Sequence, residues 1–461
     1  MAMGQERRER QESMWVETSA LPSAPGHPFY ERLHEVLKRH GFTEFVEEEC
    51  RRYYAKLLGR PSVPPTVYFK MLLIGYFEGI DSERGIAWRV ADSMGLRQFL
   101  GYELTQGTPD HSSISRTRRL MSVETHRMVF QWVLGVLAKE KVLKGKTLGI
   151  DATTLEANAA LRSIVRRDTG ESYEEFLVRL AQASGIETPT RADLAKLDKN
   201  RKGKGSNQDW EHPHDPDARI AKMKDGRTHL AHKAEHAVDM DSGAVVAVTM
   251  QGADQGDTET LPETLRETAE NLAAVEQDEE AAAKLDENPM SKGVLDKGYH
   301  SNDTLMLLDT IGMRAYVSEP DRGRRNWEGE GKEHARYCVY GNRRRIRGDH
   351  GKALLRQRGE KVERTFAHVY ETGAMRRTHL RHHDNILKRL LIHVGGYNLS
   401  LVLRKHCGIG KPRTLQDVYR KVQAALSTLF RPYWSAMKRL CGLYDAIRPN
   451  WSITQPLAQA G

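Results

Sequence analysis

The chain has 461 residues, enough for about three domains of roughly 150 residues each and for a large core without disulfides or structural metals. Lysine plus arginine (71) exceeds aspartate plus glutamate (62), so the formal charge is +9, which favours a polyanionic partner such as nucleic acid. Only 39% of the residues are hydrophobic, and no apolar run approaches the roughly 20 residues of a membrane helix, which excludes a membrane-spanning protein.

Residues 1–26 mix both charge signs and lack the apolar segment of a secretion signal, so we expect a mobile leader. The four cysteines are dispersed along the chain and form no CxxC pair. This distribution fits the reducing cytoplasm and argues against a zinc site built from cysteines.

Residues 27–140 are predicted to form a helical domain, because apolar residues recur there at helical spacing. The clearest runs lie at 29–37 and 67–77. The second run follows Pro64 and Pro65, which favour the start of a helix.

Short helices are predicted within 82–100, with Ser82 as an N-cap and Gly95 as a break. The turn at 107–110 leads into a helix with three arginines, Arg116, Arg118 and Arg119. This combination resembles a helix-turn-helix, which would bring the arginines close to DNA. A helical packing domain with a solvated basic face explains the same pattern.

Beyond residue 140 the pattern changes to short apolar strands separated by helices. We expect strands at 147–153, 232–239, 245–250, 293–296 and 314–317. Helices are expected at 258–285, 302–311, 356–370 and 386–404. These elements predict a multidomain α/β protein with a mixed sheet covered by helices over 141–405, followed by a helical C-terminal segment over 406–461.

Two insertions interrupt this predicted core, near 160–225 and near 320–350. The first contains the run 199–207, which has the composition of a flexible basic loop. The second is rich in arginine and poorly periodic. Its arginines could clamp DNA phosphates, and Trp327 could stack on an unpaired base, although a solvated flexible loop also explains the stretch.

Two of the expected strands end in an aspartate, Asp151 and Asp296. Side chains at strand ends can converge at the edge of a sheet, and carboxylate oxygens suit Mg²⁺ or Mn²⁺. Glu363, on the helix at 356–370, is the candidate third carboxylate for a two-metal phosphoryl-transfer site. Taken singly, each residue also fits a simpler role, as a turn former, a cap or a surface charge.

Several short motifs, in this order, resemble the core of bacterial insertion-sequence transposases of the DDE group, in the broad superfamily of insertion sequences four and five. They are Gly149-Ile150-Asp151-Ala152-Thr153, Asp215-Pro216-Asp217-Ala218-Arg219, His232-Lys233-Ala234-Glu235-His236-Ala237-Val238-Asp239, Leu295-Asp296-Lys297-Gly298-Tyr299 and Val362-Glu363-Arg364-Thr365-Phe366. The helical N-terminal section also resembles the domain that these enzymes carry ahead of the core. The similarity spans roughly residues 28 to 405.

This resemblance implies a ribonuclease-H-like fold for the core and a catalytic, metal-binding triad of Asp151, Asp296 and Glu363. It implies two Mg²⁺ (or Mn²⁺) ions, cleavage at the ends of the element and strand transfer into target DNA. The expected partners are double-stranded DNA and further copies of the chain, in a homodimer or a higher assembly. The expected location is the bacterial cytoplasm, in association with the nucleoid.

The charge pattern and the resemblance together predict a set of DNA-binding residues outside the triad. They are Arg116, Arg118, Arg119, Lys297, Tyr299, Arg324, Arg325, Arg344, Arg356 and Arg364. The chain departs from the family pattern at Gly359 and Tyr370, where an arginine and a lysine are common. Arg356, Arg358 and Arg364 could supply the phosphate contacts instead.

Two other functions remain open from the sequence. One is a nuclease of the same fold that cuts DNA but does not join it. The other is a DNA-binding protein derived from a transposase that has no catalytic activity.

Overall fold

The computed structural model describes residues 27–55, 62–103, 105–201, 205–223, 226–321, 323, 325–329, 332–413, 426 and 428. The predicted leader, most of the predicted C-terminal segment and Arg324 lie outside these residues. The chain divides into two units, Met1–Gly410 and Lys411–Gly461. All elements named below belong to the first unit.

Helices form most of the described part of 27–140, as predicted. They are α1 (Pro28–Arg39), α2 (Phe42–Cys50), the short turn η2 (Arg51–Tyr53), α3 (Pro65–Glu78), α4 (Glu83–Asp92), α5 (Met94–Leu100), α6 (His111–Leu120) and α7 (Val123–Lys139). The N-cap at Ser82 is confirmed, because its hydroxyl accepts a 3.1 Å hydrogen bond from the Gly85 N–H. The predicted break falls at Ser93, which caps α5, instead of at Gly95.

The helix α15 (His383–Cys407) packs against α3 and α7 and joins the N-terminal helices to the core. Among the described helices, α15 is long and apolar enough, by length and composition, to cross a membrane. However, 89% of its most apolar window is buried inside the protein, as in the core helix of a large domain.

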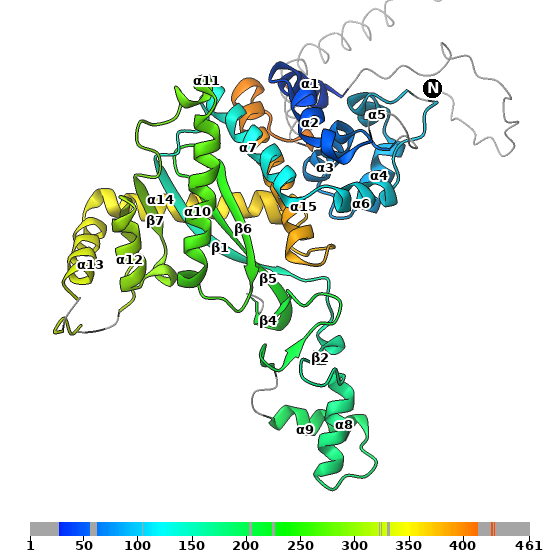
Figure 1. Ribbon diagram of the computed structural model, residues 1–461, viewed down its shortest axis with the longest axis vertical. Coiled ribbons are helices and arrows are strands. Elements are labelled where there is room, and N and C mark those ends of the chain that lie inside the picture. Colours follow the sequence, from blue (N-terminus) through cyan, green and yellow to red (C-terminus); the bar gives the residue numbers. More distant parts are fainter. Residues whose placement is uncertain are drawn as a thin grey trace, which may run out of the picture. The chain divides into compact units, whose positions relative to one another are not determined.

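A mixed sheet of six strands forms the core after residue 140 (Figure 1). Its strands are β1 (Thr147–Glu156), β4 (Arg219–Lys222), β5 (Thr228–Asp239), β6 (Val245–Gly252), β7 (Lys292–Leu295) and β8 (Arg314–Val317). Both β6 and β4 pair with β5, and the order continues through β1 and β7 to β8. Strands β1, β5 and β6 are antiparallel neighbours, whereas β7 and β8 run parallel to β1, with α12 (Asn302–Thr310) as the crossover between them.

Helices cover both faces of this sheet. Consecutive strand residues point to opposite faces. Glu235 accepts a hydrogen bond from Thr260 of α10 (Asp257–Glu276), and the ring of its neighbour His236 lies 5.1 Å from that of Phe366 on α14 (Asp349–Phe366). The predicted mixed α/β layout is therefore confirmed. The expected helix 258–285 is divided into α10 and α11 (Glu279–Ala282).

At each outer edge of the sheet, the side chain of an asparagine from a helix makes hydrogen bonds with the backbone N–H and carbonyl groups of one strand residue. The Asn342 side chain accepts from the Val317 N–H (2.9 Å) and donates to the Val317 carbonyl (2.8 Å) on β8. The Asn398 side chain makes the same pair of bonds, 2.9 and 2.8 Å long, with Val245 on β6. Both asparagines are buried, and each one replaces a neighbouring strand at its position.

The first predicted insertion has small elements and hydrophobic clusters of its own, one of them around the buried Trp210. Its elements include η3 (Leu161–Ser163), β2 (Val165–Arg166), α8 (Tyr173–Ala183), α9 (Arg191–Asn200) and β3 (Trp210–Glu211), and Figure 1 shows α8 and α9 lying side by side.

The second insertion contains the helix α13 (Lys332–Arg347). A flexible loop is therefore the wrong interpretation for residues 332–347. The helix forms because Ala335, Cys338, Val339 and Asn342 recur at helical spacing and are buried on one face, where α13 packs against α12 and β8. The high arginine content of the other face hid this pattern in the sequence.

Two adjacent glycines of α15 provide a test of the packing between α15 and α3. A Cβ at Gly396 would lie 2.8 Å from Tyr76 Cδ1 on α3, whereas a Cβ at Gly395 would meet its nearest atom, Val133 Cγ2, at an ordinary 3.6 Å. We expect Gly396→Ala to destabilise the protein by about 1–3 kcal/mol through overpacking. Gly395→Ala should stabilise it by about 0.5–1 kcal/mol, because alanine loses less backbone entropy in a helix. Thermal unfolding of both variants checks the prediction, and an equal response would contradict the close approach.

Candidate active site

Asp151 lies near the middle of β1, on the face of the sheet that α14 covers. It is mostly buried, and its Oδ1 accepts a 2.9 Å hydrogen bond from the Ala152 N–H. Burial raises the pKa of Asp151 to about 6; the Arg358 charge opposes this shift, and the carboxylates of Asp296 and Asp257 add to it.

Asp296 follows the last residue of β7, the strand next to β1. Its Oδ1 accepts a 2.7 Å hydrogen bond from the Gly298 N–H, which holds the short turn η4 (Lys297–Tyr299) at the strand end. The carboxylate of Asp257, at the start of α10, lies close by. A Cβ on Gly298 would be 2.4 Å from Asp257 Oδ2 and 3.1 Å from Asp296 Oδ1, so only glycine leaves room for both carboxylates.

The guanidinium of Arg358, on α14, connects the two aspartates. Its Nη1 lies 2.9 Å from Asp151 Oδ2, and its Nη2 lies 3.9 Å from Asp296 Oδ2. The carboxylates of two adjacent strands thus converge on one positive charge. Hard oxygen donors that already share a cation are a suitable pair for Mg²⁺ or Mn²⁺.

Gly149 allows α14 to approach the sheet closely enough for this contact. A Cβ at this position would be 2.7 Å from Met240 Sδ and 3.2 Å from both Arg358 Cγ and Val362 Cγ2. Any larger residue would therefore push α14 away from β1, and with it Arg358.

Glu363 is the next residue after Val362 and so lies beside the same strand, but its side chain is exposed. It lies five residues beyond Arg358, about 7.5 Å along the helix axis. Among the described residues, the groups whose ligand atoms all lie within 4.8 Å of one another do not include Asp151, Asp296 and Glu363 together. The structure therefore brings the two aspartates together and leaves Glu363 at the margin of the site.

The opposite face of the sheet carries a second polar network beside the aspartates. The buried Lys233 of β5 donates to Asp257 Oδ1 (2.7 Å) and to Thr260 Oγ1 (3.0 Å). Glu235 Oε1 accepts from Thr260 (2.9 Å) and from the Tyr299 hydroxyl (2.7 Å), and burial raises the pKa of Glu235. This network fixes the turn that holds Asp296.

The predicted DNA-binding residues fall into two groups. Arg118, Tyr299 and Arg325 make internal contacts, with Glu83 and Asn385, with Glu235, and with Glu319 respectively. Arg118 and Tyr299 are also buried, at 7% and 0% exposure. The exposed members are Arg116, Arg119, Lys297, Arg344, Arg356 and Arg364.

The helix α13 presents a basic surface with aromatic side chains. Tyr337 and Tyr340 are exposed, and the guanidinium groups of Arg336 and Arg343 lie 5.9 and 5.2 Å from the Tyr340 ring centre. Trp327 also contacts Tyr340, with 6.0 Å between the ring centres. This arrangement suits a nucleic acid backbone and its bases.

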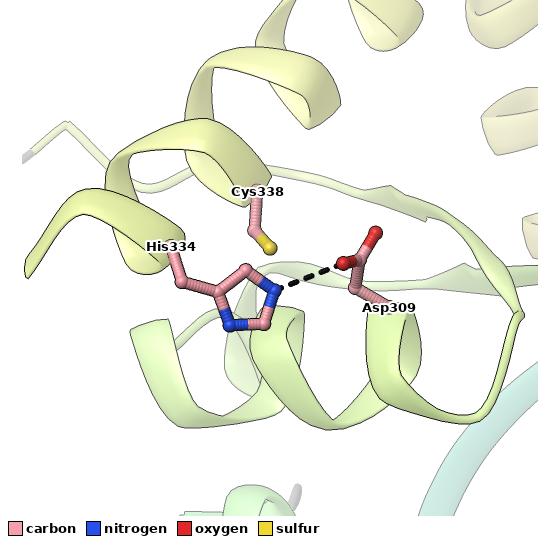
Figure 2. A group of neighbouring side chains, drawn as sticks. All are labelled: Asp309, His334 and Cys338. Atoms are coloured by element: carbon pink, nitrogen blue, oxygen red, sulfur yellow. Dashed lines mark hydrogen bonds and ion pairs between the residues drawn. The ribbon is translucent and has the colours of Figure 1, made fainter. Parts of the chain in front are cut away.

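A cluster of side chains lies between α12 and α13. Figure 2 shows Asp309, His334 and Cys338 pointing toward one another, with a 2.9 Å ion pair between His334 Nε2 and Asp309 Oδ2. Burial, followed by the nearby Asp309, raises the pKa of the Cys338 thiol, so this cysteine is held in its protonated form.

Sequence reasoning missed the central role of Arg358 and the proximity of Asp257 to Asp296. The sequence pattern indicates only a phosphate contact for Arg358. The available signals were the glycines Gly149 and Gly298, each two residues from one of the aspartates, because a glycine within or beside a strand often marks a close approach.

Comparisons with known proteins give one finding. Residues 18–120 match the family model described as Transposase domain (DUF772), a stretch that includes α1 to α6 and is less than a quarter of the 461 residues. This match supports a transposase family and a DNA-processing role. Searches of curated proteins and of solved structures found no match.

The raised pKa of Asp151 predicts a pH-dependent gain in stability for Asp151→Asn. Above pH 6 the wild-type carboxylate is ionised at a position that disfavours its charge, and asparagine removes this cost. We expect the variant to be more stable by on the order of 1–3 kcal/mol at pH 7–8.

Below the unfolded-state pKa of 3.8 both folded and unfolded wild-type chains are protonated, so the difference should shrink between pH 6 and pH 4 and then vanish. Thermal unfolding of both proteins at several pH values, in the presence of a chelator, measures this difference in stability. A gain that does not change with pH would contradict the assigned electrostatic cause.

Proposed function

We propose that the protein is a DDE transposase that cleaves DNA at the ends of its element and joins the freed ends to target DNA. The observation that carries this proposal is the convergence of Asp151 and Asp296 on Arg358. Two buried or half-buried carboxylates on adjacent strands cost free energy unless they serve a cation or a reaction. The match of residues 18–120 to a transposase domain supports the same conclusion.

The order of the strands supports a ribonuclease-H-like core. Three antiparallel neighbours, β1, β5 and β6, are followed in the chain by β7 and β8, which add to the other side of β1 in parallel. In this arrangement Asp151 in β1 and Asp296 after β7 lie on neighbouring strands, with α14 across them.

In this function Asp151 and Asp296 hold divalent cations, with Glu363 as the third carboxylate. When bound, two such ions favour ionisation of the attacking oxygen and neutralise the charge that develops on the leaving oxygen. The protein holds the two aspartates in place through the Ala152 and Gly298 N–H groups. These contacts fix the position of the two carboxylates, and positioning is the main protein contribution to phosphoryl transfer.

Arg358 has two roles in this proposal. Without divalent cations it neutralises the aspartate pair. With DNA present, its guanidinium turns to a phosphate oxygen, and Glu363, five residues further along α14, turns inward. The Glu363 side chain is exposed, so it can change its rotamer without disturbing the packing of α14.

The exposed basic residues form the proposed DNA surface, with Lys297 beside Asp296 and Arg344 on α13. The two DNA ends of an element must be cut together, so we propose a homodimer or a higher assembly on double-stranded DNA. The proposed location is the bacterial cytoplasm, in association with the nucleoid.

Substitution of each triad member tests the catalytic assignment. Asp151→Asn, Asp296→Asn and Glu363→Gln should each lower Mg²⁺-dependent cleavage of an element end by at least about 1,000-fold, because each removes a charge that holds the ions. DNA binding should persist. Glu360→Gln is the matched control, since Glu360 is exposed on the same helix and paired only with Arg364, so it should keep near-normal activity.

A pre-cut DNA end with a free 3′-hydroxyl distinguishes the alternatives. A transposase joins this end to target DNA, a nuclease does not, and a non-catalytic DNA-binding protein neither cuts nor joins. Full cleavage by all three triad variants would refute the site assignment.

Arg344→Ala tests the DNA surface on α13. Arg344 is exposed and has no ion pair among the described residues, so its removal should weaken binding to all DNA sequences about equally. The slope of log affinity against log salt concentration should fall by about one, as expected for the loss of one phosphate contact. Arg32→Ala on α1 removes the same charge elsewhere, and there the slope should stay unchanged. An unaltered slope for Arg344→Ala would exclude α13 from the interface.

A further inference from the structure

A second group of ligand-type side chains lies at the start of α15, outside the candidate active site. It consists of Asp215, Asp217 and His382, which we call the α15 cluster. One ligand atom of each residue lies within 4.8 Å of the other two. The aspartates come from the turn before β4, and His382 is the residue before the first turn of α15.

Each aspartate of this cluster uses one oxygen to hold the backbone of α15. The His382 N–H donates to Asp215 Oδ1 (3.0 Å), and the His383 N–H donates to Asp217 Oδ2 (3.0 Å). The other oxygen of Asp215 has no hydrogen bond of acceptable geometry, and its neighbour is His232, with Nε2 at 3.3 Å. A carboxylate anchored in this way through one oxygen is the usual form of an ordered metal ligand.

The buried end of the cluster contains polar atoms without hydrogen bonds. Asp215 and His232 are both 0% exposed. Asp215 Oδ2 and both ring nitrogens of His232 have no hydrogen-bond partner of acceptable geometry, and His232 Nε2 lies 3.3 Å from Asp215 Oδ2. Buried polar atoms are nearly always satisfied in folded proteins, so this position calls for a ligand.

His382 completes the cluster from the solvent side. Its Nδ1 lies 3.9 Å from Asp217 Oδ2, and its backbone has φ +67°, a left-handed conformation that favours glycine. A histidine here is disfavoured by its backbone, and a role for its imidazole would account for its presence.

The cluster of Asp309, His334 and Cys338 is the other candidate among the described residues (Figure 2). There Asp309 and His334 already satisfy each other in an ion pair, and the side chains of both are 48% exposed. The α15 cluster differs because its innermost oxygen is buried and has no hydrogen bond.

We propose that the α15 cluster binds one Zn²⁺ ion through Asp215, Asp217 and His382, with His232 orienting the Asp215 carboxylate. Imidazole and carboxylate donors suit zinc, and three protein ligands leave a position for water. The ion ties the turn before β4 to the start of α15. This site is separate from the triad and does not depend on the proposed transposase activity.

Zinc binding by the purified full-length chain tests this proposal. After metal removal and dialysis against zinc sulfate, elemental analysis should find one ion per chain that is lost in His382→Gly. Glycine suits φ +67°, so this variant should fold at least as well as the wild type while lacking a ligand. Zinc affinity should fall by more than about tenfold, and the rise in unfolding temperature on adding zinc should shrink. Asp217→Asn should behave in the same way.

Two control variants assign the ion to the α15 cluster. Cys338→Ser removes a ligand of the other cluster, and Asp151→Asn weakens the candidate active site. Both should retain the ion that His382→Gly loses. The proposal is wrong if the wild type binds no zinc, if His382→Gly and Asp217→Asn bind zinc as the wild type does, or if the ion is lost only in a control variant.

Discussion

The burial of Asp151 beside a second carboxylate, that of Asp296, is the constraint on which the arrangement of the site depends. Burial is the main cause that raises the pKa of Asp151, and the carboxylate of Asp296 adds to it, so the charged form of Asp151 needs a positive partner. Arg358 supplies that partner, 2.9 Å from one carboxylate and 3.9 Å from the other. Its reach depends in turn on Gly149, which lets α14 lie close to β1. The absence of a side chain at Gly149 on β1 thus allows Arg358 to reach the carboxylates of both β1 and the turn after β7.

The side chains of the central strand β5 contact different helices on the two faces of the sheet. Lys233 and Glu235 point toward α10, where they bond with Asp257, Thr260 and Tyr299 and hold the turn after β7. His236 points to the other face, where it contacts Phe366 at the end of α14 and Tyr370 in the turn that follows, η5 (Ala367–Glu371). Because successive side chains of β5 point to opposite faces of the sheet, this one strand contacts both the turn after β7, which carries Asp296, and α14, which carries Glu363.

The sequence predicted five of the six strands and most of the helices of the core, because apolar residues there follow simple periods of 2 and 3.6; it missed β4, which lies in the predicted first insertion. It failed at α13, where the buried residues are hidden among arginines, and at the division between α10 and α11. The prediction that both aspartates end strands is right for Asp296 and wrong for Asp151, which lies near the middle of β1. The two lie close together because β7 pairs with β1. The contact of Arg358 with both could not be predicted, since it depends on how closely α14 approaches the sheet, a distance that no local pattern encodes.

The asparagines at the two outer strands have a consequence for self-association. An outer strand normally offers free amide and carbonyl groups, and another chain can add to the sheet there. In this protein Asn342 and Asn398 already take up those groups at Val317 and Val245. Growth of the sheet from one copy into the next is therefore obstructed at these points. A contact between two copies would therefore use other surfaces than these two strand positions.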